Sequence, residues 1–446
     1  MAETAPGVLH VSLEAGLSRA RHQFRDGAAA LTRRRFLLGA AALAAGGTAV
    51  GVGLERAAGG AKHVRLVPLG AQPAGLPERQ HAWTATLARE ADGNPVPPRF
   101  DRLLFFDVKH DPSAAGARLL EAALRTLERR YRWGPAGLLF TAGWGQPYFA
   151  KTLRVASPIP QARALSDFEL PAIDDYDLCL HLACDDEQRL ASVEAALRGG
   201  ARPPGTDGPL DLSEALVFRE TRTGFVGAGL PAAHQGVGGI PPGRPVSKQA
   251  PLFMGFKSSL RGNQASEDDV TITDGPFAQG TTMQASYMRL RLETWYEQLD
   301  QRERVARMYA PQVSPQQAER FTADAKSDPG GFGEAVRRYG VIGHSQSMAR
   351  VRRKGKPLIL RRDFDTVDGG QAGLHFVSIQ RSIEDFVKTR NAMNASSAQL
   401  QNPSITDTVN NGINEFIFVL KRGNYILPSR AERSFPLLPG RARALS

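Results

Sequence analysis

One segment of the sequence combines a histidine with charged residues at a spacing that suits chemistry. The stretch from Gly343 to Asp363 contains His344, a basic segment, and the apolar run Leu358–Leu360 directly before Arg361. The apolar run predicts a short buried strand, from whose end the charged side chains emerge. His344 and Arg361 can then lie on opposite walls of one cavity. A neutral imidazole can bind a heme iron, and a fixed cation opposite it can stabilise charge as an O–O bond breaks.

Each of these residues also has a purely structural interpretation. His344 follows a glycine, and a histidine in that position is commonly a loop or cap residue. Arg361 and Arg362 also match the solvated end of a strand. His375 lies in the middle of the apolar stretch GLHFVSIQ. There we expect a hydrogen-bonded core histidine and not a metal ligand.

Composition excludes some classes of protein. The chain has 446 residues, 42% hydrophobic and 23% charged, which is typical of a globular protein with room for two domains. Its net charge is +11, of which +3 lies in the first 36 residues. The remaining excess is spread out, with no basic tract interleaved with aromatics, so we expect no nucleic-acid partner.

Two cysteines are present, Cys179 and Cys184, in a segment predicted to be a strand. Their odd spacing directs them to opposite faces of a strand, so a disulfide between them is not expected. We interpret both as small core residues. A redox or metal site with His181 is the alternative, although no further ligand has a suitable spacing.

The N-terminal region resembles an export signal. Arg33, Arg34 and Arg35 precede Phe36-Leu37 and an apolar run rich in Ala and Gly. Two arginines before x-Phe-Leu resemble the twin-arginine signal of bacteria and archaea, which carries folded proteins, often with a cofactor bound. An ordinary anchor helix is the alternative, but the run is only weakly hydrophobic. We therefore expect a periplasmic, extracellular or envelope-associated protein.

The next part of the chain predicts a mixed domain. Strands are expected at 102–108, 137–145, 177–184 and 215–220, and helices at 113–131, with Ser113 as N-cap, and at 186–197. The order strand–helix–strand–strand–helix–strand is that of a ferredoxin-like split βαβ unit.

A second unit of the same style follows. It has a strand leading to a helix at 294–308, a short helix at 331–339, the strand ending at Arg361, a strand at 374–380, a helix at 383–394 and a strand at 415–420. The expected fold is α+β, with two tandem ferredoxin-like domains of mostly antiparallel sheet. The expected divisions are a signal and linker over 1–60, the domains over 99–221 and 252–440, and a Gly/Pro-rich connector over 222–251 that is a candidate pocket loop.

These features together resemble the dye-decolorizing (DyP-type) heme peroxidases. The resemblance runs from about Phe100 to Pro428 and rests on the order of the leader, the two ferredoxin-like halves and four short motifs. The motifs are Gly255-Phe256-Lys257, a following histidine, Leu360-Arg361-Arg362, and the strand from Gly373 to Gln380. It implies a secreted protein that binds heme b in its second domain.

The resemblance also assigns roles to residues. His344 matches the proximal heme ligand, and Arg361 matches the distal arginine. Gly255 and Phe256 begin the family's G-x-x-D-G motif, but its aspartate falls at Ser258, and its last glycine is also a serine. In the family that aspartate lies over the iron and is thought to move a peroxide proton, which a serine cannot do as a base near neutral pH.

Replacement carboxylates are present nearby in the sequence. Asp363 lies two residues beyond Arg361, so both side chains can face the same side of a strand. Glu267, Asp268 and Asp269 follow the altered motif, and their default interpretation is a solvated acidic loop. Asp363 is therefore a candidate substitute.

Three functions remain open from the sequence. The first is an exported heme peroxidase, whose partners are hydrogen peroxide, an unidentified reductant and the twin-arginine translocation machinery; assembly into a homo-oligomer stays open. The second is a heme-binding or iron-handling protein with weakened chemistry, favoured by Ser258. The third is a heme-free envelope protein that uses the fold for interaction.

Overall fold

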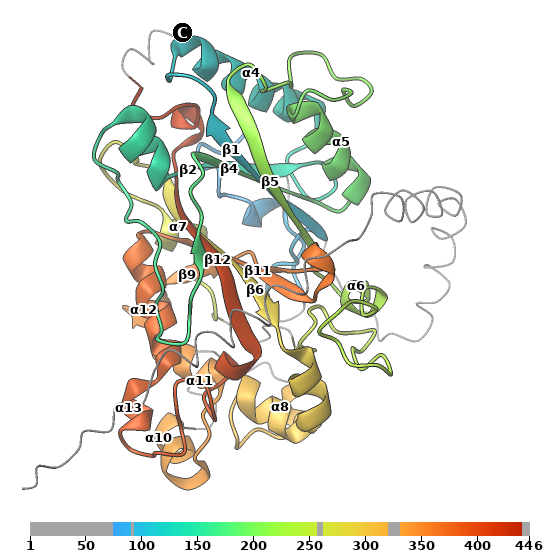
Figure 1. Ribbon diagram of the computed structural model, residues 1–446, viewed down its shortest axis with the longest axis vertical. Helices are drawn as coiled ribbons and strands as arrows, with labels where there is room; N and C mark the ends of the chain where they lie inside the picture. The colour runs from blue at the N-terminus through green and yellow to red at the C-terminus, as the bar shows by residue number, and fades with distance from the viewer. Residues whose placement is uncertain (1–74, 91–92, 257–261, 320–330, 439–446) are drawn as a thin grey trace, which may run out of the picture. The chain divides into compact units, whose positions relative to one another are not determined.

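The N-terminal half alternates strands and helices in the predicted order. This computed structural model describes residues 75–90, 93–256, 262–319 and 331–438. The half contains β1 (Phe100–Val108), α4 (Ala114–Arg130), β2 (Leu139–Gly145), β4 (Leu178–Cys184), α5 (Glu187–Leu197) and β5 (Leu216–Phe225) (Figure 1). The spatial order β5-β1-β4-β2, all antiparallel, is that of a ferredoxin-like sheet.

Local chemistry explains these elements. Ser113 caps α4 by accepting a hydrogen bond from the Gly116 backbone N–H, as its position before the apolar run predicts. Leu120, Leu124 and Leu127 recur at helical spacing and are fully buried. Strands β2 and β4 are buried along their whole length, so their apolar runs form the centre of the core.

The C-terminal half repeats the arrangement. Its strands are β6 (Thr281–Leu290), β9 (Ile359–Arg361), β11 (Gly373–Gln380) and β12 (Ile417–Leu427), and α12 (Ile383–Asn394) joins β11 to β12. The spatial order β12-β6-β11-β9 is again ferredoxin-like. The two halves therefore have the same topology, and the predicted α+β class of tandem ferredoxin-like units is confirmed.

Helices fill the long connection between β6 and β9. It contains α8 (Gln301–Met308), α9 (Pro315–Glu319), α10 (Phe332–Glu334) and α11 (His344–Ala349). The single helix predicted at 294–308 is wrong, because a π-helical turn ends at Gln298 and Asp300 starts α8. Asp300 and Glu303 form a reciprocal capping box, which favours a new helix start at that point.

The remaining described elements are short. They are β3 (Ala172–Ile173), α6 (Leu230–Ala233), α7 (Glu267–Val270), β7 (Arg352–Arg353), β8 (Lys356–Pro357), β10 (Phe364–Thr366), α13 (Ser396–Gln399), the π-helical turns Tyr148–Leu153, Thr294–Gln298 and Ala335–Tyr339, and the 3-10 turns Thr84–Thr86, Asp368–Gly370, Asn414–Phe416 and Arg430–Glu432.

Two pairings join the halves into one sheet. Strand β2 pairs with β12, where Gly145 opposes Tyr425. Strand β10 pairs with β11 and also meets β5, where Asp365 opposes Phe225. The described strands thus close into a ring. Strand β9 is not needed for this closure; it pairs with Ser378–Gln380 of β11, while β10 pairs with Gly373–His375 of the same strand. The domain boundaries at 99–221 and 252–440 stay a prediction, and the leader over 1–60 lies outside the described residues.

Other expectations concern single residues. Cys179 and Cys184 are buried and unbridged, as predicted, and burial raises the pKa of the Cys184 thiol to about 11. His375 is a buried core histidine, with Nε2 at 3.0 Å from Asp368 Oδ2. Within the described part of the chain, no helix has both the length and the apolar character that a membrane span requires.

Candidate active site

A largely apolar cavity lies in the C-terminal half. Strands β6, β11 and β12 contribute side chains of one sheet face, and helices α11 and α12 contribute further ones. Its volume is about 200 Å³. The lining side chains used below come from these elements and from the segments 252–256, 308–309 and 357–365. Among the described residues, the first lining residue along the chain is Leu252, and no residue of the Gly/Pro-rich connector over 222–251 lines the cavity, although that connector was a candidate pocket loop.

His344 lines this cavity from the first position of α11. Gly343 precedes it at the N-cap, where the backbone N–H donates to Gln346 Oε1 at 2.9 Å. Burial, and secondarily Arg361 and Arg390, lower the pKa of His344 to about 4. Its Nδ1 is buried without a hydrogen-bond partner among the described residues. The imidazole is therefore neutral at physiological pH, the form that binds a metal.

Charged residues reach the cavity at every second position of one segment. Arg361, Asp363 and Asp365 all line it, although β9 ends at Arg361 and β10 begins at Phe364. Arg362 faces the other side, where its guanidinium lies 3.7 Å from the centre of the Trp83 ring. Arg361 is thus the cavity-facing member of the arginine pair.

A buried ion cluster forms part of the same wall. Glu169 Oε1 lies 2.7 Å from Arg390 Nη2, and Glu169 Oε2 lies 2.8 Å from Arg422 Nη1. All three residues are 5% exposed or less, and both arginines line the cavity. Burial by itself would raise the pKa of Glu169, but the two arginines hold it below its usual value. One carboxylate between two guanidinium groups leaves the cluster with a positive charge.

Thioether side chains are concentrated at the cavity. The chain has seven methionines. Five of them line this cavity, namely Met254, Met288, Met308, Met348 and Met393. Methionine is unbranched and flexible, so these side chains can adapt to the shape of a ligand.

The altered motif is described only at its start. Phe256 lines the cavity and packs edge-on against Trp295 and Tyr309. Gly255 has a φ of +86°, a backbone conformation that glycine adopts readily. Ser258 lies outside the described residues, so its assignment to the site stays a prediction.

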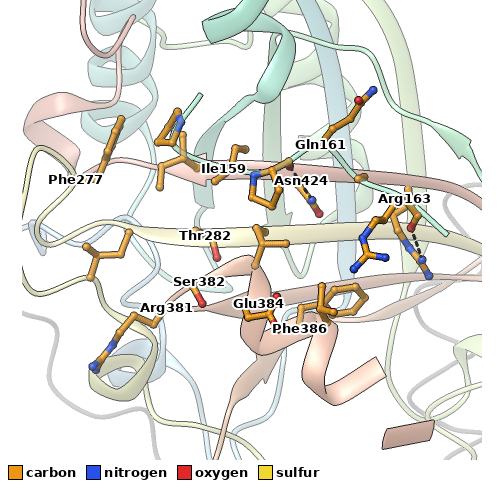
Figure 2. A pocket seen from close by; sticks show the side chains of 18 of the residues that line it. Ile159, Gln161, Arg163, Phe277, Thr282, Arg381, Ser382, Glu384, Phe386 and Asn424 are labelled. Carbon is orange, nitrogen blue, oxygen red and sulfur yellow. Dashed lines mark hydrogen bonds between the residues drawn. The ribbon is translucent and has the colours of Figure 1, made fainter. Parts of the chain in front are cut away.

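A second groove adjoins the cavity. It has a volume of about 540 Å³, and Phe386 and Arg422 line both spaces. In Figure 2, Phe277 and Arg163 lie at opposite ends of this groove. A wall built from these two shared side chains therefore stands between groove and cavity.

The acidic residues after the altered motif do not reach the cavity. Ser266 and Asp269 form a capping box at the start of α7. Glu267 Oε1 accepts hydrogen bonds from the backbone N–H of Trp83 at 2.6 Å and of Thr84 at 2.8 Å. Their roles are structural, so they are not the substitute carboxylates.

Sequence reasoning missed several cavity residues. Asp365 continues the alternation of Arg361 and Asp363, and this spacing was a usable signal. Arg390 and Arg422 come from α12 and β12, and no local pattern marks them as partners of Glu169. Only the folded chain brings those three together.

A family model and solved structures match the chain. The model of a family of unknown function (DUF7405) matches residues 98–429. No curated protein sequence matches the chain.

The similar structures share one fold. A DypB variant from Rhodococcus jostii, solved in complex with heme, is 12% identical, with a TM-score of 0.54; the match covers 80% of this chain and 99% of that one. A DyP-type peroxidase from Cellulomonas bogoriensis is 17% identical, with a TM-score of 0.52, covering 82% and 95%. A dye-decolorizing peroxidase from Bacteroides thetaiotaomicron is 13% identical, with a TM-score of 0.52, covering 76% and 95%. At these identities the likeness establishes the fold.

Proposed function

Because this chain belongs to the family of unknown function DUF7405 and has the fold of the DyP-type peroxidases, we propose that it is an exported heme b peroxidase. It reduces hydrogen peroxide and oxidises an electron donor that is still to be identified. The observation that carries the proposal is the cavity in which a neutral His344 and Arg361 both take part.

The donor set of the cavity fits heme. His344 offers a neutral imidazole in apolar surroundings, as a heme iron requires. The positive charge left on the Arg390–Glu169–Arg422 cluster is suited to a propionate of the porphyrin. We therefore assign iron ligation to His344 and propionate binding to Arg390 and Arg422.

The volume of the cavity sets a condition on binding. About 200 Å³ is below the roughly 300–1,000 Å³ of sites that take drug-sized ligands. A porphyrin must therefore displace side chains as it binds. The five lining methionines are the side chains best able to move, because they are unbranched and flexible.

The chain's own residues then have distinct tasks. When bound, heme supplies the redox chemistry, that is, the electrons exchanged with peroxide and with the donor. His344 holds it in place, and Arg361 stabilises the negative charge that develops on peroxide oxygen. Arg361 stays protonated and cannot act as the base. The apolar side chains exclude water.

A specific observation favours a second candidate, a heme-binding or iron-handling protein with weak peroxide chemistry. A ligating histidine usually donates its second N–H to a carboxylate or carbonyl, which raises the basicity of the ligand. His344 Nδ1 has no such partner among the described residues. Ser258 in place of the motif aspartate also favours this second candidate, because a serine cannot act as the base for peroxide.

His344→Ala tests the assignment of the heme ligand. We expect the purified variant to lose the Soret band of stably bound heme, because no other histidine lines the described cavity. The exposed His110→Ala is the matched control and should bind heme as the native protein does. Full heme occupancy and an unchanged spectrum in His344→Ala would contradict the proposal. Peroxide turnover by native protein at several pH values separates the two candidate functions.

A further inference from the structure

Asp365 differs from the other acidic residue at the cavity. Among the described residues, Asp363 and Asp365 are the two carboxyl groups in the cavity lining. Asp365 is 1% exposed and lies on β10, at the point where this strand meets β5. Asp363 is half-buried in the turn between β9 and β10. The deeper carboxyl is therefore Asp365.

The two oxygens of Asp365 have different environments. Oδ2 accepts a hydrogen bond from the Phe253 backbone N–H at 2.5 Å. Oδ1 is buried and has no hydrogen-bond partner among the described residues. An unpaired buried carboxylate oxygen is costly, and a proton on that oxygen removes most of the cost. The geometry thus favours a carboxyl that carries a proton on Oδ1.

Burial and charge act in the same direction. Burial, and secondarily the charge of Asp363, raise the pKa of Asp365 well above its usual value, and the bond from Phe253 only partly opposes this. Tyr296 is the titratable neighbour from the segment after β6; its hydroxyl donates to the Phe253 carbonyl at 2.6 Å. On β11, His375 is already paired with Asp368. A carboxyl whose pKa is raised in this way holds its proton more firmly than an exposed aspartate and can act as an acid.

We propose that Asp365 is the proton-exchanging carboxyl of this cavity, in place of the acid that Ser258 lacks. The inference rests on the proposed function. Peroxide loses a proton from one oxygen and gains one on the other, which then leaves as water. Asp365 gives its Oδ1 proton to the oxygen that leaves as water and takes up the proton that the other oxygen releases, so the carboxyl ends as it began. Overall, peroxide takes up two electrons and two protons to give two waters, and the donor supplies the electrons through the cofactor.

The first test uses the protein without heme. Infrared spectroscopy near neutral pH should show the C=O stretch of a protonated carboxylic acid. We expect Asp365→Asn to remove this band and Asp363→Asn to retain it. Asparagine still offers an oxygen to the Phe253 N–H, so the fold should be kept; Asp365→Ser is the second variant. Asp101 is a second buried aspartate whose pKa burial raises, so the variants are compared with native protein by difference. No loss of carboxylic-acid intensity in the Asp365 variants overturns the proposal, whatever the protein does with heme.

The second test uses heme-loaded protein and hydrogen peroxide, whose leaving oxygen must receive a proton. The rate of the Soret shift should fall about 100- to 10,000-fold in Asp365→Asn, the range of general acid–base assistance. Asp365→Glu, which keeps the carboxyl, should recover part of the rate. An unchanged rate in Asp365→Asn, or the main loss in Asp363→Asn, overturns the proposal. Failure of the native protein to take up heme would instead refute the proposed function, and the infrared result would still stand.

Discussion

Glu169 determines the charge state of the cavity wall. It is the carboxylate shared by Arg390 and Arg422, and Oε2 also accepts from the Leu165 backbone N–H at 3.0 Å. Removing one partner from a buried ion cluster leaves an unpaired charge, which costs more than the cluster contributes as a whole. The residue therefore matters for the fold as well as for the ligand.

Glu169→Gln should lower the free energy of unfolding by about 3–5 kcal/mol at neutral pH. Because the arginines lower the folded-state pKa below the unfolded value of 4.5, the stabilisation is present above about pH 4.5 and is lost as pH falls through the folded pKa. The variant and native protein should thus converge in acid. Urea unfolding at several pH values measures this. Asp175→Asn, which breaks the exposed Lys151 pair, is the control and should cost under about 1 kcal/mol. A constant difference across pH would contradict the argument.

At the scale of elements, helix α11 depends on a close backbone contact. A Cβ on Gly343 would lie 1.9 Å from the Tyr309 carbonyl oxygen, at the residue that follows α8. Glycine at this N-cap therefore lets α11 approach close enough to present His344 to the cavity. The position of His344 therefore depends on backbone packing between α11 and the end of α8, two helices that are distant in sequence.

Gly343→Ala should displace α11 and weaken heme binding strongly, because neither backbone can yield by that amount without moving its helix. Heme titration followed at the Soret band measures the affinity. Gly236→Ala is the matched control, since a Cβ at Gly236 meets no atom within 4 Å. Equal heme affinities in the two variants would mean that this contact does not position His344.

Elements were more predictable than the site. Apolar periodicity predicted the long strands of both halves and the helices α4, α5 and α12, because strand and helix patterns depend on neighbouring residues. The β10 strand was missed because it has three residues and its partners, β5 and β11, come from both halves. Asp365 lies on this strand, so it was missed with it. The proximal candidate His344 and the cavity-facing Arg361 were predicted from short motifs, and the structure places both at one cavity.

At the scale of the whole molecule, the two halves are not separable units. Strand β10 and the β2–β12 pair close one sheet through both of them, and the described residues belong to a single compact unit. The twin-arginine route that we propose for this chain carries proteins that are already folded.

Changing Arg33 and Arg34 together to Lys should stop export while leaving the charge unchanged, because a receptor recognises the arginine pair. Cell fractionation and immunoblotting locate the protein. Arg19 and Arg21, changed together to Lys in the same leader, form the control and should leave export unaffected. Normal arrival of the Arg33/Arg34 variant in the envelope would rule out this route.

The methionine-rich lining has a consequence for how long each molecule can work. Thioethers are themselves oxidised by peroxide, and methionine sulfoxide is polar and chiral where the native side chain was apolar. Five such side chains stand around the space where we place the oxidant. Each peroxide molecule that is not reduced can oxidise one of these methionines, and the resulting polar side chain would weaken porphyrin binding. The protein would then be inactivated after a finite number of turnovers, which the supply of electron donor would determine. The inactivated protein would carry added oxygen on five methionines, namely Met254, Met288, Met308, Met348 and Met393.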